Sequence, residues 1–236
     1  TAIGANAMTT YNVTDSGNDF NVAVGYNSLT SLTTGFSNTG VGSLTLESTT
    51  TGANNTACGY GALDSNTTAN NNTAVGYDAL TANTTGTQNT AVGQNALDAN
   101  TTGNNNIAVG SHVLGATTTG GNNTGIGKDA LFNNTTASNN TAVGYYALVA
   151  NTTGTLNVAV GAQALDANTT ANSNTAIGQN SMTANTTGAE NVAVGRASLQ
   201  NNTTANANTA VGYAAMDANT TGGANTAVGD QALTAN

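Results

Sequence analysis

The chain has 236 residues, of which only 6% are charged, and its formal net charge is −9 at pH 7. Globular domains usually carry about 25% charged residues, and the two basic residues of this chain, Lys128 and Arg196, cannot neutralise a row of phosphates. The composition therefore argues against nucleic-acid binding and against an anionic membrane surface. No run of the sequence reaches the roughly 18 apolar residues that a membrane helix needs.

The first element is an atypical copy of a repeat. It begins with Thr1-Ala2-Ile3-Gly4 and has Met8 where later copies have Leu. Four extra residues then intervene within residues 11–20, and from Asn21 onward the copies are regular. The chain is therefore expected to be one repeat array over residues 1–236, with 1–20 as the atypical first copy and 21–236 as the regular part.

The regular copies are 17 residues long, as in NTAVGYDALTANTTGTQ at residues 72–88. We number the Asn of NTAVG as position 1. Position 1 is always Asn in these copies, position 4 is Val or Ile except for Cys58, position 9 is Leu or Met, positions 13 and 14 are Thr, and position 15 is Gly or Ala. Constant positions indicate a repeated environment, whereas positions 6, 7, 10, 16 and 17 vary and are expected to face water.

The repeat favours strands over helices. A helix would pass through Val-Gly and Asn-Thr-Thr-Gly in every copy, and Gly costs about 1 kcal/mol relative to Ala in a helix interior. Seventeen residues cannot bury a hydrophobic face alone, so each copy must stack on its neighbours. The sequence predicts an all-β protein, a parallel β-solenoid or β-roll of about fourteen 17-residue repeats.

Period-two alternation places positions 2 and 4 on one face of the strand and position 3 on the other. We expect positions 2, 4 and 9 to form a thin core, with position 4 and 9 residues stacked as a ladder: Val75, Leu80, Val92, Leu97, Val143 and Leu148. Glycines at position 5 are expected to turn corners, through positive φ or close backbone approach: Gly76, Gly93, Gly110, Gly144 and Gly161. So thin a core predicts that apolar surface is also buried between chains in a symmetric homo-oligomer.

The core phrase NTAVG, varied as NVAVG at 157–161 and 191–195 and as NTAIG at 174–178, resembles the SVAIG-type repeat of trimeric autotransporter adhesin heads. The longer phrase NTAVGYDALTANTTG is similar to repeats of phage tail fibres and bacterial surface proteins. The resemblance implies a left-handed parallel β-roll, three chains side by side, and an extracellular, cell-surface or virion-fibre location. The unit of 17 residues is longer than the adhesin-head unit, which suggests that the NTT segment is added to each copy.

Residues that could carry chemistry are few, and we expect no enzyme, no cofactor and no metal site. His112 has no Cys or second His near it and is expected at the surface. Cys58 takes the place of Val at position 4, so we expect a buried, inert thiol. Carboxylates recur at position 10 but alternate with other residues, and the calcium-binding repeat GGxGxD is missing.

Tyrosines recur at position 6, beside the corner glycine: Tyr26, Tyr60, Tyr77, Tyr145 and Tyr213. One interpretation is an aromatic strip that stacks on the sugars of a receptor. The alternative is that each tyrosine covers the edge of the core, as Ser, Gln and Ala would do in other copies.

The NTT phrase also has two interpretations. Its asparagines start the Asn-X-Thr pattern for N-glycosylation: Asn66, Asn83, Asn100, Asn134, Asn151, Asn168, Asn185, Asn202 and Asn219. NNT adds further acceptors, as at Asn54, Asn71 and Asn139. The structural alternative is that the amides stack into a hydrogen-bonded ladder.

Three functions compete at this stage. The first is an extracellular rod or fibre segment of adhesin or tail-fibre type, which spaces or presents a binding surface and contacts itself as a homotrimer or head-to-tail filament, and through its tip a carbohydrate or host receptor. The second is a filament scaffold decorated with N-glycans. The third is an ice-binding solenoid, although adjacent strand positions point to opposite faces, so positions 13 and 14 offer only one outward Thr column.

Overall fold

The computed structural model describes residues 1–11 and 20–234. They form two compact units, Thr1–Thr119 and Gly120–Asn236, and each unit is a parallel β-solenoid in which one repeat makes one turn. We call such a turn a rung. The fold class expected from the 17-residue period is confirmed, whereas the expectation of one array over the whole chain stays a prediction.

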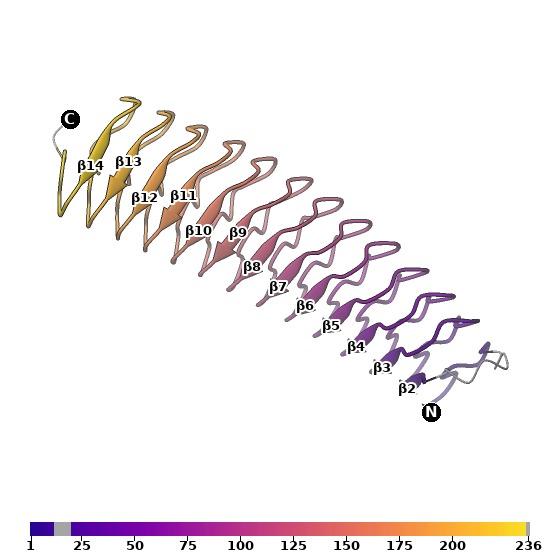
Figure 1. The fold of residues 1–236 in the computed structure, drawn as a ribbon. Coiled ribbons are helices and arrows are strands. Elements are labelled where there is room, and N and C mark those ends of the chain that lie inside the picture. The colour runs from indigo at the N-terminus through magenta and orange to yellow at the C-terminus, as the bar shows by residue number, and fades with distance from the viewer. Residues whose placement is uncertain (12–19, 235–236) are drawn as a thin grey trace. The chain divides into compact units, whose positions relative to one another are not determined.

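Each rung contributes one short strand, and within each unit the strands of successive rungs pair in parallel, in sequence order (Figure 1). The first unit contains β1 (Ala2–Ile3), β2 (Val22–Val24), β3 (Thr39–Val41), β4 (Thr56–Cys58), β5 (Thr73–Val75), β6 (Thr90–Val92) and β7 (Ile107–Val109). The second unit contains β8 (Thr124–Ile126), β9 (Thr141–Val143), β10 (Val158–Val160), β11 (Thr175–Ile177), β12 (Val192–Val194), β13 (Thr209–Val211) and β14 (Thr226–Val228).

The strand register follows the sequence period. Ala74 of β5 pairs with Ala91 of β6, its equivalent one repeat later. The first rung differs, because Ala2 of β1 pairs with Ala23 of β2, a longer step that agrees with four extra residues in the first copy. The insertion itself, expected within residues 11–20, lies largely outside the described residues.

The return segment of each rung, positions 6–11, has an unusual backbone. Residues at positions 7 and 9 adopt positive φ in every rung, as in Asp78 (φ 51°) and Leu80 (φ 54°). The backbone N–H groups of positions 7 and 9 point in opposite directions along the stack. Asp78 N donates to Tyr60 O in the preceding rung at 2.9 Å, and Leu80 N donates to Ala96 O in the following rung at 3.0 Å. The return segments are therefore joined from rung to rung by backbone hydrogen bonds, as the strands are.

The core lies between the strand and the return segment, and its composition corrects the sequence prediction. Position 3 points inward: Ala74 and Ala91 are fully buried, as are positions 8 and 9 in the rungs from β2 to β13, whereas Leu233 in the last rung is 44% exposed. Leu80, Leu97 and Leu148 lie in the core as predicted. The assignment of position 4 to the core was wrong, because Val75 and Val92 are more than a third exposed and Val143 is partly exposed.

The reason for this inversion is the small space between strand and return segment. At Gly40, which occupies position 3 of β3, an added Cβ would lie 2.6 Å from Ser28 Oγ and 2.8 Å from Thr45 Oγ1, both side chains of position 8. Position 3 is therefore Gly beside Ser28 and Thr45, whereas Ala74 fits in a rung where position 8 is Ala79. The alternation of side chains between the two faces of the strand was predicted correctly. Which face points inward is set by this spacing and not by hydrophobicity.

The corner glycines behave as predicted. Gly76 has φ 139°, and an added Cβ would lie 2.4 Å from the carbonyl oxygen of Gly93 in the next rung. The same positive φ, between 133° and 138°, occurs at the other predicted corners: Gly93, Gly110, Gly144 and Gly161. Position 5 thus requires Gly for two reasons. Its backbone conformation is one that L-residues rarely adopt, and successive rungs approach each other closely there.

Candidate functional surfaces

The asparagines of the NTT phrase, at position 12, form a ladder inside the solenoid. Asn83 Nδ2 donates to Asn66 Oδ1 of the preceding rung at 3.1 Å and to Gly86 O of its own rung at 3.0 Å. Asn83 Oδ1 accepts from Asn100 Nδ2 at 2.9 Å. Where position 12 is Thr49, its hydroxyl accepts instead from Asn66 Nδ2. The ladder interpretation of NTT is therefore correct.

A second ladder runs through position 1. Asn72 Oδ1 accepts from the backbone N–H of Asn89 in the next rung at 2.9 Å, and Asn72 Nδ2 donates to Gly86 O at 2.8 Å. Gly86 O, at position 15, thus accepts one amide from each ladder. Buried polar groups are costly unless paired. The amides of both columns are paired with neighbouring rungs and share one backbone carbonyl acceptor per rung, which explains why Asn is invariant at position 1 of the regular copies and prevails at position 12.

The nine NTT asparagines predicted as glycan acceptors are buried. Eight of them are fully inaccessible, and Asn219 is 2% exposed. An N-linked sugar replaces an amide hydrogen on Nδ2. In Asn83 that nitrogen donates two buried hydrogen bonds, one to the preceding rung and one within its own rung. The prediction of glycans at these nine positions is wrong for the folded solenoid, because the ladder occupies the atoms and the space that the sugar would need.

Positions 2 and 4 of all rungs form the outer sheet face of each unit. Position 2 is Thr, Val or Ile in the regular copies, position 4 is Val or Ile apart from Cys58, and neither position carries a charged residue. In the first unit Ile3 of this face is 59% exposed, and five more of its apolar residues are between 36% and 43% exposed: Val41, Val75, Val92, Ile107 and Val109. Each unit therefore presents a regular, uncharged, β-branched surface.

Cys58 lies on this outer sheet face, at the end of β4. Its side chain is exposed, which corrects the expectation of a buried thiol. The error has the same origin as that for Val75, since both residues occupy position 4. The thiol is therefore accessible to reagents.

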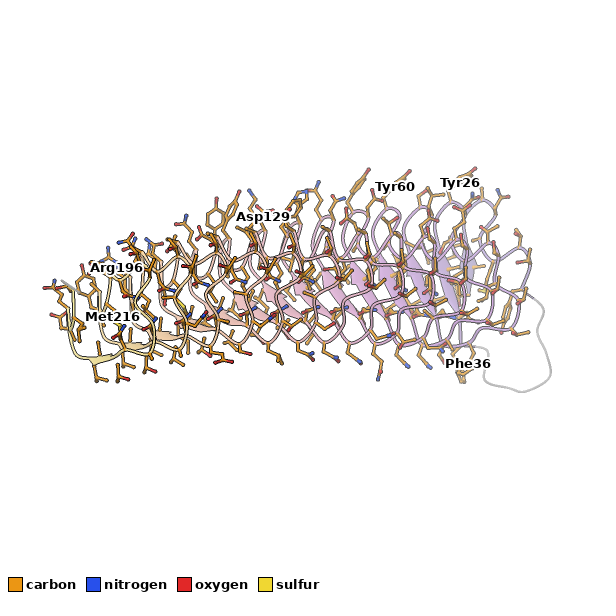
Figure 2. The ribbon with its side chains drawn as sticks, turned by 90° about the horizontal axis from the view of Figure 1, so that it is seen from above. Tyr26, Phe36, Tyr60, Asp129, Arg196 and Met216 are labelled. Carbon is orange, nitrogen blue, oxygen red and sulfur yellow. The ribbon has the colours of Figure 1, made fainter. Side chains whose placement is uncertain are left out.

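The five tyrosines of position 6 are all exposed, between 46% and 54%, and do not cover the core. Tyr26 and Tyr60 project from the same edge of the first unit, while Phe36 lies on the opposite edge (Figure 2). Tyr60 and Tyr77, in adjacent rungs, stack with ring centroids 5.4 Å apart and an interplanar angle of 12°. They are the only pair of the five that the described contacts bring together.

The tyrosines of the second unit have other neighbours. Tyr145 contacts Tyr146 of the same rung in an edge-to-face arrangement, with ring centroids 4.2 Å apart. The guanidinium of Arg196 lies 5.6 Å from the centroid of the Tyr213 ring, at cation–π distance. The predicted strip is thus a stacked pair in one unit and two separately engaged rings in the other, with Tyr26 two rungs from the pair.

Carboxylates gather beside the stacked pair. The pKa of Asp64 is raised to about 6, chiefly by burial and then by Glu47, one rung away at the same position 10, and by Asp78. Asp78 also raises the pKa of Tyr77. At Asp98 and Asp166, again at position 10, burial raises the pKa of the carboxyl group. Position 10 therefore lies partly inside the rung, although the sequence predicted that it faces water.

The two Thr columns differ in exposure. Thr84, at position 13, is partly buried, and its hydroxyl donates to Thr101 O of the next rung at 3.0 Å. Thr85, at position 14, is exposed. The prediction that only one of these columns faces outward is confirmed.

Other chemistry is sparse in the described part of the chain. His112 is partly buried, and its Nδ1 lies 2.8 Å from Ser111 Oγ. Among residues 1–11 and 20–234 there is no group of three or more His, Cys, Asp or Glu side chains placed to hold a metal, and no pocket. None of the described residues form a helix of the length and apolarity needed to span a bilayer.

Sequence reasoning missed one constraint, the positive φ at positions 7, 9 and 17. β-Branched residues are strongly disfavoured in this conformation. The described chain has Leu or Met at position 9 and never Val or Ile, and positions 7 and 17 contain no Val, Ile or Thr. This exclusion was visible in the sequence, and it could have identified positions 7 and 17 as constrained positions.

The fold and its ladders define a parallel β-solenoid repeat protein with a 17-residue rung. Comparisons of the chain with protein-family models, curated proteins and solved structures gave no match.

Proposed function

We propose that the chain is a segment of an extracellular structural fibre of adhesin or tail-fibre type, assembled from three copies side by side and without catalytic activity. The observation that carries this proposal is the outer sheet face, an uncharged, β-branched surface repeated in each unit. The likeness of NTAVG to the repeats of adhesin heads favours three copies over two.

The outer sheet face is better suited to contact with a second copy of the chain than to contact with water. Monomeric proteins rarely expose large continuous apolar patches, and here Val75 and Val92 are exposed on adjacent rungs. The net charge of −9 is carried entirely outside positions 2 and 4, so two copies could meet through this face without placing like charges against each other. The interior offers each rung only small residues and one Leu or Met, so burial between chains would add substantially to stability.

Cys58 allows a direct test, because it is an exposed thiol on the proposed interface. A short bifunctional maleimide should join two chains through Cys58 and give a covalent dimer on a denaturing gel. The matched control moves the thiol to the exposed Thr85, in the double variant Cys58→Ala/Thr85→Cys, and should give far less dimer. A compact monomer in sedimentation velocity, together with equal crosslinking of both proteins, would refute the assembly.

The stacked pair Tyr60 and Tyr77 supports a carbohydrate as the partner that such a fibre would contact. Aromatic faces with a nearby polar acceptor suit the apolar faces and hydroxyl groups of sugars, and Asp78 supplies an acceptor beside Tyr77. Replacing both tyrosines with Ala should weaken binding to a glycan array while leaving the denaturation midpoint nearly unchanged. Unaltered array binding would remove the pair from the recognition surface.

Ice binding is the second candidate, and runs of Thr at position 2 of the outer sheet face, such as Thr39, Thr56, Thr73 and Thr90, favour it. Rungs spaced by about 4.8 Å would repeat this hydroxyl along each unit. A thermal-hysteresis assay of the parent chain decides between the fibre and ice binding. A surface that is buried between chains gives no hysteresis until a change such as Val75→Lys separates the copies.

A further inference from the structure

Asn-X-Thr triplets of the described chain fall at three places in the rung. Position 12 contains the nine NTT asparagines, position 11 contains Asn133 and Asn201, and position 17 contains Asn54, Asn71, Asn122 and Asn139. The sequence pattern treats the three groups alike, and the structure separates them.

Position 12 is closed to modification, as the Asn83 ladder shows. At position 11 the side chains are exposed, but their amide nitrogens are engaged. Asn133 Nδ2 donates to Val149 O at 2.9 Å, and Asn201 Nδ2 donates to Asp217 O at 2.8 Å, each in the following rung. A sugar on either nitrogen would displace a contact between rungs.

Position 17 is open. Its four Asn-X-Thr asparagines are exposed, and their side-chain amides make no hydrogen bond to another described residue. All four adopt φ between 59° and 62°. Longer side chains occupy the same position at the same φ, as in Gln88 and Leu156, and Leu156 is 58% exposed. The column therefore directs its side chains into open space.

We propose that the N-glycan acceptors of this chain are the position 17 asparagines, Asn54, Asn71, Asn122 and Asn139. The reaction joins Nδ2 to the anomeric carbon of an oligosaccharide carried on a lipid pyrophosphate. The bond from that carbon to the pyrophosphate oxygen breaks, the lipid pyrophosphate leaves, and Nδ2 loses one proton. This inference rests on the proposed extracellular location, since the lipid-linked donor is met on the secretory route.

The test is secretion of the full chain from eukaryotic cells that carry out N-glycosylation. The folded, protease-resistant fraction is deglycosylated enzymatically in ¹⁸O-labelled water, and peptides are mapped for labelled aspartate. The label is expected at position 17 and not at position 12. A folded chain with label at Asn83, or a folded chain at the bare mass of 23.0 kDa, would overturn the proposal.

Two conservative variants sharpen the result without touching an asparagine. Thr73→Val removes the triplet of Asn71 and leaves a residue type that Val158 already provides at position 2, so the label at Asn71 should disappear. Thr85→Ala removes the triplet of Asn83 through an exposed side chain, and the glycan mass should not change. The Cys58 crosslinking test uses chain made in bacteria without sugars, so failure of one proposal leaves the other measurable.

Discussion

Leu80 illustrates how one residue satisfies two demands. Its side chain is fully buried, which is worth about 1.5–3 kcal/mol for a Leu, while its backbone has φ 54°. Met182 and Met216 meet the same two demands at position 9. Size and hydrophobicity alone would admit Ile at this position, and the backbone does not.

Leu80→Ile should therefore destabilise the chain more than Leu80→Met. Ile keeps the volume but adds a β-branch in the left-handed region, where even ordinary L-residues lose about 1–2 kcal/mol. The Met variant should lose less than about 1.5 kcal/mol, as volume-conserving changes do. Chemical denaturation of both variants measures the difference, and equal midpoints would contradict the role given to the backbone.

Asp64 should make stability depend on pH. Its pKa is about 6 in the folded chain against an ordinary value of 3.8, so the folded state holds a proton that the unfolded state releases between these values. Ionisation of Asp64 then destabilises the fold as pH rises from about 4 to 6. Asp98 and Asp166 act in the same direction.

We expect a higher denaturation midpoint at pH 4.5 than at pH 7.5, with a smaller difference in Asp64→Asn. Glu190→Gln, a change at an exposed carboxylate, is the control and should keep the dependence of the parent chain. A parent chain that is more stable at pH 7.5 would show that the sign is wrong.

At the scale of the element, the unit of stability is the ladder and not the strand. Strands of three residues are too short to be stable alone, and each rung adds to them two amide ladders and the hydrogen-bonded return segments. The ladders also explain why asparagine, usually a surface residue, prevails at two buried positions.

Asn83→Ala should break the position 12 ladder and cost about 1–3 kcal/mol. Asn66 Oδ1 would lose its donor, and Asn100 Nδ2 would lose one of its two acceptors. Asn71→Ala, at an exposed position 17, should stay within about 0.5 kcal/mol of the parent chain. Similar losses in the two variants, measured by denaturant titration, would argue against the ladder.

The two glycine columns should respond differently to a methyl group. Gly76→Ala places Ala at φ 139°, where strain of about 1–3 kcal/mol is added to a clash with Gly93 O. At Gly86 an added Cβ would also approach a backbone oxygen, Gly103 O at 2.4 Å, but φ lies outside the positive region and Ala69 already occupies the same position 15, so only Gly76 adds backbone strain. Gly76→Ala should therefore lower the thermal midpoint more than Gly86→Ala, and the reverse order would contradict the corner assignment.

At the scale of the whole molecule, the outer sheet face is the proposed interface between copies of the chain. Val75→Lys places a charge among uncharged neighbours, so the oligomer should dissociate while the circular dichroism spectrum of each chain is kept. Thr85→Lys makes the same change in charge at an exposed residue outside the face and should leave the sedimentation coefficient of the assembly unchanged. Dissociation by both variants would point to net charge and not to this face.

The sequence by itself determined the repeat, its period, the parallel stacking of rungs and the corner glycines, because a residue type that recurs at a fixed spacing must meet the same environment in each copy. It also determined that Leu80 and its equivalents are buried. Two alternatives that it left open, at the NTT phrase and at the Tyr column, involve residues compatible with either environment.

Only the tertiary structure decided which face of the strand is inside. The period of two residues places position 3 on the opposite face of the strand from positions 2 and 4, but it does not say which face points inward. Hydrophobicity assigned Val75 to the core, whereas the narrow space between strand and return segment is occupied by Ala74. The same spacing buries Asn83 and leaves Asn71 exposed, although both begin an Asn-X-Thr triplet. Distances between layers are a property of the closed rung, so no single copy of the repeat could reveal them.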